Sequence, residues 1–472
     1  MSAPVTDVVG TRPVVVAGAG VSGVGIARLL HGLGVKVVLV DDNLERARSI
    51  PGVEGVDTFT ASRLIDDAAI GLVVTSPGWR PSTPLLRHAA EKGLEVIGDV
   101  ELCYRLDRAG VFGAPRTWLV ITGTNGKTTT TAMLAEIMAA HDAAVGTRSA
   151  AVGNIGVAVA DALVDPRRVD ILVAELSSFQ LHWSSELTPD TGCLLNLAED
   201  HIDWHGSMAA YARDKARVFS ARHAVAGIDD PLVVEQLREL GREDYTGFTL
   251  HEPRDNEVGV IDGRITYRRN GELIDIAPTE GIEPPGPAGI LDALAASAVA
   301  LTQDVPAPTI ARALLGFRVA GHRGAIVHRG KKVWIDNSKA TNPHAADAAL
   351  AGIDGAVTWI AGGQLKGADV DELVATHADR LTSVGLLGAD AAEIARALGR
   401  HAPKSRVFIT EHTDPAAAMD ELVAFAAHEP ATTVLLAPAA ASLDMFTGMA
   451  QRGQMFADAA RSLDHSSEEE TR

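Results

Sequence analysis

Cysteine is almost absent from this chain of 472 residues, which contains only Cys103 and Cys193. Two cysteines cannot build the disulfide framework of a small secreted protein, and no cysteine–histidine cluster has the spacing of a zinc site. Long apolar runs are also missing: no stretch reaches the roughly 20 residues that span a bilayer. No basic segment followed by an apolar one opens the chain. We therefore expect a cytoplasmic protein that has no membrane partner.

Positive charge and aromatic residues are both scarce. Lys and Arg number 42 against 61 Asp and Glu, which gives a net charge of −19. A nucleic-acid surface needs a broad basic face, so this balance argues against nucleic acid as a partner. A small phosphorylated ligand needs only a few backbone N–H groups and one lysine. Aromatics make up 4% of the chain, whereas alanine and glycine are abundant, which favours helices packed closely on sheets over a β-sandwich.

Short apolar strands alternate with helical stretches along the whole chain, which is too long for one hydrophobic core. Examples are "RPVVVAGAGVSGVGIARLLHGLGVKVVLVDD", "TWLVITG", "ILVAELS" and "TVLLAPA". We predict three α/β domains: a Rossmann-like domain at residues 1–115, a central ATPase-type domain at residues 116–320, and a Rossmann-like domain at residues 321–472. Asp262-Gly263 and Asn270-Gly271 interrupt an alternating run and predict a small antiparallel unit in the central domain.

The sequence "GTNGKTT", which starts at Gly123, joins a predicted strand to a predicted helix. Free N–H groups and the dipole at a helix N-terminus favour an anion there. The two glycines permit a tight path, Lys127 can reach the β- and γ-phosphates, and the Thr128 hydroxyl can join a Mg²⁺ shell. The usual phosphate loop has a glycine five residues before Gly126, where this chain has Ile121. We interpret Ile121 as part of the strand and the loop as a shorter form, and favour nucleotide binding over a simple glycine turn.

The sequence "GAGVSG" at Gly18–Gly23 also follows a strand, and Asp41 closes the next one. This pattern is the dinucleotide fingerprint, whose physical content is a diphosphate held at a helix N-terminus. NAD and a nucleoside-diphosphate sugar satisfy it equally, and tight helix–strand packing alone also explains the glycines.

Polar groups follow several other strands. Glu175 ends a strand in "AELSSFQL", and the loop "NLAEDHIDWHG" supplies carboxylates and imidazoles at Asp200, His201, Asp203 and His205. Such groups beside a triphosphate suit Mg²⁺, although similar loops are often plain polar surface. Lys215 in "YARDKARVF" is by default a solvated helix lysine. In the third segment, "DNSKATN" offers donors for a carboxylate ligand, but capping of the next helix by Ser338, Thr341 or Asn342 explains it equally well.

In combination and in order, these motifs resemble the Mur ligases over essentially the whole chain. The matching segments are "GAGVSG", "SPG", "GDVEL", "GTNGKTTT", "GNIG", "ELSSFQL", "NLAEDHIDWHG", "YARDKARVF", "GHR", "DNSKATN", "GGQLKGAD" and "APAAASLDMF" with "QRG" after it. Within the family, the similarity is greatest to the members that add D-glutamate to UDP-N-acetylmuramoyl-L-alanine. "GTNGKTT" is the family's own form of the phosphate loop.

The resemblance implies an ATP-dependent amide-forming ligase of peptidoglycan precursor synthesis, a monomer that acts on small molecules only. The γ-phosphoryl group passes to the alanyl carboxylate, and the amine of D-glutamate displaces phosphate from the acyl phosphate. The implied catalytic residues are Lys127, Glu175, His201 and Lys215. Two Mg²⁺ are implied, with Thr128 and Glu175 serving one and His201 the other. Lys215 corresponds to a lysine that is carbamylated in the family. An ammonium cannot bind a cation, whereas addition of CO₂ turns the side chain into an anionic metal ligand.

The resemblance also implies the substrate contacts. Those to ATP are Gly123, Thr124, Asn125, Gly126, Lys127, Thr128, Thr129, Asp336 and Lys339. Those to the UDP substrate are Gly18, Gly20, Ser22, Gly23, Asp42, Ser76 and Asn154. Those to D-glutamate are Arg323, Thr341, Lys366, Ser442 and Phe446. The chain departs from the family pattern at Asn337, where an acidic residue is usual, so Asp336 takes the nucleotide role. It departs again at Gly289 and Asp292, which replace two asparagines.

Three other functions stay open at this point. A sister Mur or folylpolyglutamate-type ligase is expected to carry Asp-Asn-Pro-Arg or His-Asn-Pro in the third domain, and neither motif occurs. An NAD-dependent oxidoreductase with an ATP-binding domain fits "GAGVSG" alone. A nucleotide-switch module without chemistry does not explain the number of Mg²⁺-type ligands.

Overall fold

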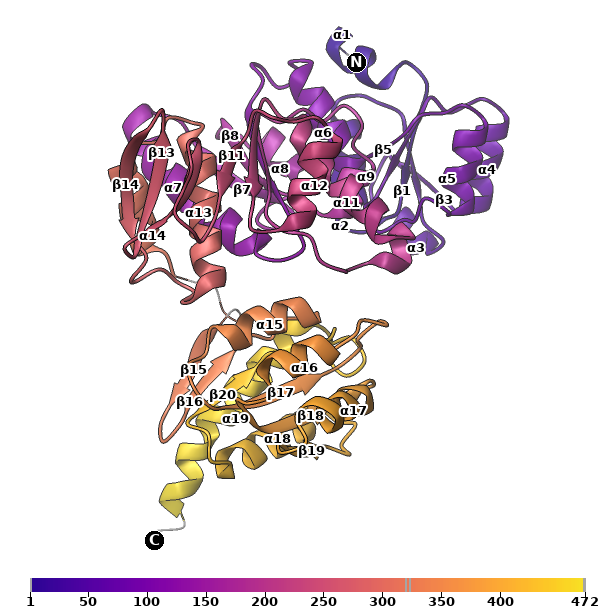
Figure 1. Ribbon diagram of the computed structural model, residues 1–472. Coiled ribbons are helices and arrows are strands. Elements are labelled where there is room, and N and C mark those ends of the chain that lie inside the picture. Colours follow the sequence, from indigo (N-terminus) through magenta and orange to yellow (C-terminus); the bar gives the residue numbers. More distant parts are fainter. Residues whose placement is uncertain (1, 319–320, 322–323, 470–472) are drawn as a thin grey trace. The chain divides into compact units, whose positions relative to one another are not determined.

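The structure is a computed structural model that describes residues 2–318, 321 and 324–469. Three sheets with flanking helices form a multi-domain α/β fold, which confirms the predicted fold class (Figure 1). The chain divides into two compact units. The first two sheets belong to one unit, which comprises residues up to Leu197, His201–Pro278 and Asp292–Leu314. The third sheet belongs to the other, which comprises Ala198–Asp200, Thr279–Leu291 and residues from Leu315 onward. The boundaries near residues 115 and 320 stay a prediction.

The first sheet is parallel, in the order β3 (Glu54–Val56), β2 (Val37–Val40), β1 (Val14–Ala17), β4 (Leu72–Thr75) and β5 (Val96–Gly98). Val14 and Val16 face one hydrophobic cluster, with α1 (Ala3–Val9), α2 (Val21–Gly32) and α6 (Asp99–Arg108). Val15 and Ala17 face the other, with α4 (Thr58–Asp66) and α5 (Pro84–Glu91). Helices on both faces explain why these strands are apolar throughout. The strand order reverses between β1 and β4, which is where sheets of this kind bind ligands.

The central sheet has nine strands. Their order is β14 (Glu272–Pro278), β13 (Arg264–Arg269), β12 (Glu257–Ile261), β11 (Thr246–Phe248), β10 (His223–Gly227), β9 (Thr191–Leu194), β6 (Thr117–Thr122), β8 (Ile171–Glu175) and β7 (Ser149–Gly153). Its helices are α7 (Lys127–Val145), α8 (Val159–Val164), α9 (Ser178–His182), α10 (Ile202–His205), α11 (Met208–Ala216), α12 (Pro231–Glu239), α13 (Pro287–Leu301) and α14 (Ala307–Gly316). Parallel pairing brings the carboxyl ends of β6, β8 and β9 together at one edge.

The predicted antiparallel unit is present and extends the parallel sheet at the β12 edge. Asp262-Gly263 links β12 to β13, with φ angles of 48° and 71°. Asn270-Gly271 links β13 to β14, with φ angles of 53° and 78°. Positive φ at both central residues defines the hairpin turn that Asn-Gly and Asp-Gly favour.

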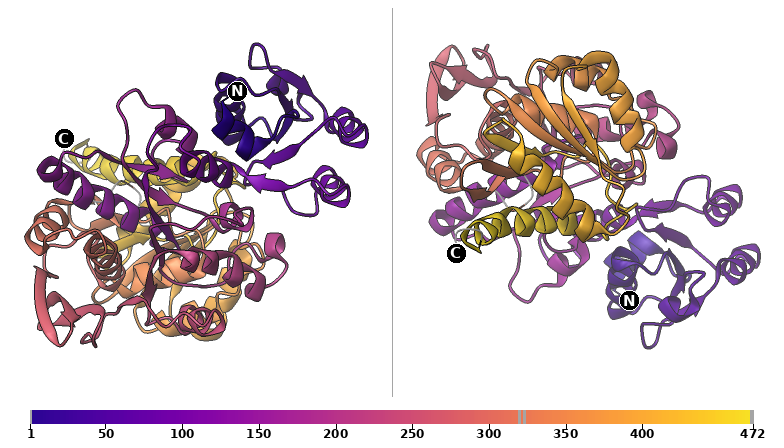
Figure 2. Two further views of the ribbon diagram at one scale, coloured as in Figure 1. Left: turned by 90° about the horizontal axis from the view of Figure 1, so that it is seen from above. Right: turned by 90° about the horizontal axis from the view of Figure 1, so that it is seen from below.

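The third sheet pairs β15 (Ala325–Arg329) antiparallel with an otherwise parallel set: β16 (Val333–Asp336), β20 (Thr433–Leu436), β17 (Val357–Gly362), β18 (Leu381–Leu387) and β19 (Arg406–Ile409). One face packs on α15 (Pro343–Ala351), α16 (Asp371–His377) and α17 (Ala391–His401). The other packs on α18 (Pro415–His428) and α19 (Met449–Glu469), so the sheet lies between two layers of helices (Figure 2). Among the described residues, no helix is both long and apolar enough to span a bilayer.

A buried ion pair fastens α6 to the start of β6. Arg116 and Asp107 are 2% and 1% exposed, and Arg116 Nη1 lies 2.6 Å from Asp107 Oδ1. Arg116 also donates to the carbonyl oxygens of Val169 and Leu163, and the Trp118 indole donates to Asp107 Oδ2. The pair therefore joins elements that carry both sheets of the first unit.

We expect Arg116→Met to lower the free energy of unfolding of the first unit by about 3–5 kcal/mol, because it leaves the Asp107 carboxylate buried and uncompensated. Urea unfolding followed by tryptophan fluorescence measures this. The matched control is Arg264→Met, which breaks an ion pair to Asp275 whose side chains are 45% and 58% exposed and should leave the midpoint nearly unchanged. Equal midpoints for the two variants would contradict the role given to Arg116.

Candidate functional site

The predicted phosphate loop lies between β6 and α7. Gly126 is the N-cap residue of α7 with a φ of 82°, and a Cβ there would collide with the Asp292 carboxylate. A Cβ at Gly123 would lie 2.8 Å from Leu195 Cβ, so close approach requires both glycines. The Lys127 ammonium donates to the Thr124 carbonyl over 2.7 Å, which folds the side chain back over the loop. Backbone N–H groups and one cation thus converge where a helix begins, as anion binding requires.

Neighbouring elements hold this loop in place. The side-chain oxygen of Asn196 accepts from the Asn125 N–H over 2.9 Å, and its amide donates back to the Asn125 carbonyl. The Thr124 hydroxyl contacts the Tyr211 hydroxyl at 2.9 Å. Asp292 accepts a hydrogen bond from the Thr130 hydroxyl over 2.8 Å. The residue that departs from the family pattern at position 292 therefore contacts the phosphate loop and α7.

Glu175 and Lys215 both lie beside the loop. Glu175 is the register partner of Ile121 on the adjacent strand and is 1% exposed. Lys215, at the end of α11, is 2% exposed, and its ammonium donates to the Gly123 carbonyl over 2.7 Å. The same nitrogen lies 4.9 Å from the centroid of the Tyr211 ring. Burial against the loop rules out the solvated helix lysine that is the default for an isolated sequence match.

The residues around the loop fit a Mg²⁺ ion. The Asn154 amide donates to Glu175 Oε1 over 2.8 Å, whereas Glu175 Oε2 is buried and accepts no hydrogen bond from any residue that the structure describes. A buried carboxylate oxygen without a donor is costly unless a cation or water serves it. Carboxylate and threonine hydroxyl oxygens, here Glu175 and Thr128, are ligands that Mg²⁺ prefers.

The loop that carries His201 divides its polar groups among several partners. His201 has a φ of 54°, an uncommon value for a residue other than glycine, and its ring centroid lies 4.8 Å from that of Phe179. Asp203 forms an ion pair with Arg80 at 2.6 Å, and His205 bonds to Asp214. Of the four predicted polar groups in this loop, Asp203 and His205 thus face partners other than the phosphate loop.

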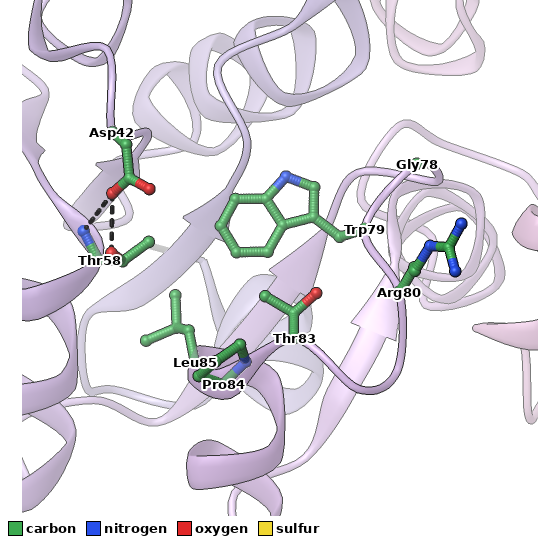
Figure 3. Close-up of a pocket in the computed structure, with 8 residues that line it drawn as sticks. All are labelled: Asp42, Thr58, Gly78, Trp79, Arg80, Thr83, Pro84 and Leu85. Atoms are coloured by element: carbon green, nitrogen blue, oxygen red, sulfur yellow. Dashed lines mark hydrogen bonds between the residues drawn. The ribbon is translucent and has the colours of Figure 1, made fainter. Parts of the chain in front are cut away.

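The N-terminal sheet has a hollow of about 450 Å³ beyond the carboxyl ends of its strands (Figure 3). Trp79 projects into its middle, with Asp42 and Thr58 to one side and Leu85 below (Figure 3). Asp42 Oδ1 accepts from the Thr58 hydroxyl over 2.7 Å. The predicted UDP-substrate residue Asp42 therefore lines a hollow with an indole ring, which can stack on a flat base.

The glycine loop borders this region. A Cβ at Gly18 would lie 2.8 Å from the Trp79 indole nitrogen and 2.9 Å from Ser76 Oγ, and a Cβ at Gly23 would overlap the Gly18 carbonyl. Ser76 Oγ donates to that carbonyl over 3.2 Å. The structure thus brings together three of the predicted UDP-substrate residues. Asp41 accepts from the Ala19 N–H over 2.9 Å, so its carboxylate faces the loop itself.

In the second unit, the predicted amino-acid residues lie on loops after neighbouring strands. Ser442 and Phe446 are 4% and 5% exposed and follow β20. The segment at Gln364, just before Lys366, pairs with Ala441 through two backbone hydrogen bonds. Thr341 follows β16. Asn342, and neither Ser338 nor Thr341, caps the next helix by accepting from the Ala345 N–H. Arg323 lies outside the described residues.

The side chain of Arg452 connects these loops. The guanidinium, 0% exposed, donates to the Ser338 hydroxyl and carbonyl over 3.0 Å each, and to the Gly362 and Ala440 carbonyls over 3.2 Å each. Burial lowers the pKa of Arg452 to about 10. Asp336, 1% exposed, accepts from the Ser338 N–H. These contacts hold the segments after β16, β17 and β20 in one arrangement.

Sequence reasoning assigned no role to Asn196, Trp79 or Arg452, although Asn196 and Arg452 lie in segments that match the family pattern. The position of Trp79, two residues after "SP" at a strand end, was an available signal for the hollow. Arg452 lies 114 residues from Ser338, so no local pattern connects them.

Two segments match known families. Residues 121–299 match the Mur ligase middle domain, and residues 322–440 match the Mur ligase, glutamate ligase domain. The UDP-N-acetylmuramoylalanine–D-glutamate ligase of Corynebacterium efficiens is 57% identical over 455 residues, which cover 95% of this chain and 94% of that protein. The Mycobacterium avium protein of the same name is 45% identical over 479 residues, covering 95% of this chain and 96% of its own.

Solved structures share the fold at lower sequence identity. The MurF ligase of Thermotoga maritima, solved in complex with ADP, gives a TM-score of 0.57 at 17% identity and covers 98% of this chain and 100% of its own. The UDP-N-acetylmuramate-alanine ligase MurC of the same organism gives 0.54 at 16% identity, covering 96% and 99%. Sequence identity over nearly the full length, together with the two matching domains, shows that this chain belongs to the Mur ligase family.

Proposed function

We propose that this protein joins D-glutamate to UDP-N-acetylmuramoyl-L-alanine with hydrolysis of ATP to ADP and phosphate, in peptidoglycan precursor synthesis. The identity of 57% to a ligase of that name, over 95% of the chain, carries the proposal. The buried side chains of Glu175 and Lys215 beside the phosphate loop support it, because a binding module needs no such groups next to a phosphate site. The proposal extends to a monomer in the cytoplasm and to the three domains at residues 1–115, 116–320 and 321–472.

The alternative of an NAD-dependent oxidoreductase loses support at the glycine loop. In dinucleotide-binding folds the acidic residue after the second strand bonds to the ribose hydroxyls. Here Asp41 accepts from the backbone N–H groups of Ala19 and Asn43, over 2.9 Å each. Its oxygens therefore support the loop.

The proposed chemistry starts from a carboxylate, which is a poor electrophile. An oxygen of the alanyl carboxylate attacks the γ-phosphorus, the bond to the β-γ bridging oxygen breaks, and ADP leaves. The amine of D-glutamate then attacks the carbonyl carbon, and phosphate leaves with the carboxylate oxygen that had attacked phosphorus. The other carboxylate oxygen remains as the amide carbonyl, and the nitrogen loses a proton. Lys127 and the N–H groups of the loop stabilise charge on the transferring phosphoryl group.

Two Mg²⁺ ions, when bound, would neutralise charge on the phosphates. Thr128 and Glu175 are the proposed ligands of one and His201 of the other. Lys215 joins them in the proposal only as a carbamate, since its ammonium cannot bind a cation. Thr341, Lys366, Ser442, Phe446 and Arg323 are the proposed contacts to D-glutamate. Asp336 and Lys339 are the proposed contacts to nucleotide from the second unit.

The proposed substrates predict a specific phosphate-release pattern. With ATP, Mg²⁺ and UDP-N-acetylmuramoyl-L-alanine, continuous phosphate release should require D-glutamate, and L-glutamate or D-aspartate should not replace it. A coupled phosphate assay with product mass confirmed by mass spectrometry makes the measurement. Release that does not depend on D-glutamate would end the assignment.

Lys127→Ala should reduce turnover by about 100- to 1,000-fold, the loss typical of removing one donor that stabilises transition-state charge. The matched control is Lys404→Ala, on an exposed lysine in the turn that follows α17. A Lys127→Ala enzyme with wild-type kcat would show that this lysine has no part in phosphoryl transfer.

Turnover should depend on CO₂ if Lys215 acts as a carbamate. Turnover of the wild-type enzyme should fall in buffer purged of CO₂ and return on addition of bicarbonate, whereas the residual turnover of Lys215→Ala should not respond. Mass spectrometry of trapped carbamate on the peptide that contains Lys215 provides a readout independent of activity. Full activity of Lys215→Ala without CO₂ would exclude the carbamate.

A further inference from the structure

Two histidines and one aspartate converge at the junction of α9, α10 and α11, outside the phosphate loop. His182 ends α9, His205 ends α10, and Asp214 lies in α11. Nδ1 of His182 and Nδ1 of His205 lie 2.8 Å and 2.9 Å from the same atom, Asp214 Oδ2. One ligand atom from each residue lies within 4.8 Å of those of the other two. None of the roles proposed for ligation uses this cluster, called here the His₂Asp cluster.

We propose that the His₂Asp cluster is a binding site for a divalent transition-metal ion of the Zn²⁺ or Co²⁺ class, separate from the Mg²⁺ ligands of the phosphate site. Two imidazoles with one carboxylate are a donor set that suits zinc and its neighbours, whereas Mg²⁺ prefers oxygen ligands. This proposal is independent of the proposed ligase function, since it is tested by metal binding alone.

The surroundings already orient the three donors. His205 Nε2 lies 2.9 Å from the Ser178 hydroxyl, and when Nε2 carries the proton this contact leaves the Nδ1 lone pair directed toward Asp214. Ligating histidines commonly donate their second N–H in this way. Arg217 Nε lies 3.5 Å from Asp214 Oδ1, the other carboxylate oxygen, so Oδ2 stays with the imidazoles.

Aromatic rings fix the two imidazoles. The Trp204 ring centroid lies 5.1 Å from His182 and 4.5 Å from His205, and Phe179 stacks on His205 at 5.6 Å with an angle of 15°. Fixed rings reduce the entropy lost when a metal binds, because the ligands need little reordering.

Access from solvent also suits a cation. The cluster borders a hollow of about 470 Å³ that gives access from solvent. His205 has no exposed side-chain surface, whereas 27% of His182 is exposed. Metal entry therefore needs only a modest separation of Nδ1 and Oδ2, to the spacing of ligands at about 2.0–2.2 Å from zinc.

Binding would link three helices that carry or adjoin proposed catalytic residues. Asp214 directly precedes Lys215, His205 lies one helical turn after His201, and α9 follows Glu175. A metal ligated by all three side chains would hold these segments together and raise the melting temperature in proportion to the logarithm of metal concentration over Kd.

The test titrates untagged, full-length protein with Co²⁺ alone, in excess Mg²⁺ and without nucleotide, so that sites built from oxygen ligands are already filled. We expect one equivalent of Co²⁺ to produce a visible absorption band and to quench tryptophan fluorescence. Trp204→Phe should lose part of the quenching and keep the absorption band, because the Trp183 ring also lies close to His182, at 4.9 Å between ring centroids. Zn²⁺ should displace the Co²⁺ and raise the melting temperature.

His182→Ala and Asp214→Asn should each weaken Co²⁺ binding at least tenfold, with folding checked by circular dichroism. The matched control is His88→Ala, because His88 is 28% exposed and pairs with a single carboxylate, that of Asp66, at 3.1 Å. The control should bind Co²⁺ as the wild type does. Wild-type affinity in His182→Ala, or no stoichiometric Co²⁺ binding by the wild type, overturns the proposal and leaves the ligase assay with Mg²⁺ unaffected.

Discussion

The space around Gly126 is the constraint on which the proposed active site depends. The Asp292 carboxylate lies so close to this residue that no side chain fits, and it is also bonded to Thr130 one turn into α7. From the other side, Asn196 fixes Asn125 through both of its amide atoms. A loop held at two points presents its N–H groups in one geometry before nucleotide arrives, so little reorganisation opposes phosphate binding. Glu175, at the end of β8, and Lys215, on α11, lie beside this loop.

The alternation of strands and helices was readable from the sequence because the signals are local. Valine-rich strands such as Val14–Ala17 need apolar residues on both faces, and Asn270-Gly271 needs positive φ at both residues. The glycine loops were readable for the same reason. In each case the residues that determine the local conformation are adjacent in the sequence.

Burial and long-range pairing were not readable in this way. Lys215 and Lys404 look alike as letters, yet Lys215 is 2% exposed because α11 packs its end against the phosphate loop. The four polar groups of the loop after β9 looked equivalent, but Asp203 pairs with Arg80, 123 residues away, and His205 pairs with Asp214. Such partners are set by how the loops and helices pack in the folded chain, and the family resemblance supplied roles for single residues without supplying these contacts.

The buried guanidinium of Arg452 restricts how segments within the second unit can move relative to one another. It bonds to Ser338, Gly362 and Ala440, which stand at the ends of three parallel strands, and separating any one of them would leave a buried donor or acceptor unsatisfied. Independent rearrangement of the segments that hold Thr341, Lys366 and Ser442 would therefore cost the free energy of at least one lost buried hydrogen bond. An amino acid bound at this proposed site would meet segments already fixed relative to one another, so selectivity among amino acids would depend on how well each one fits that arrangement.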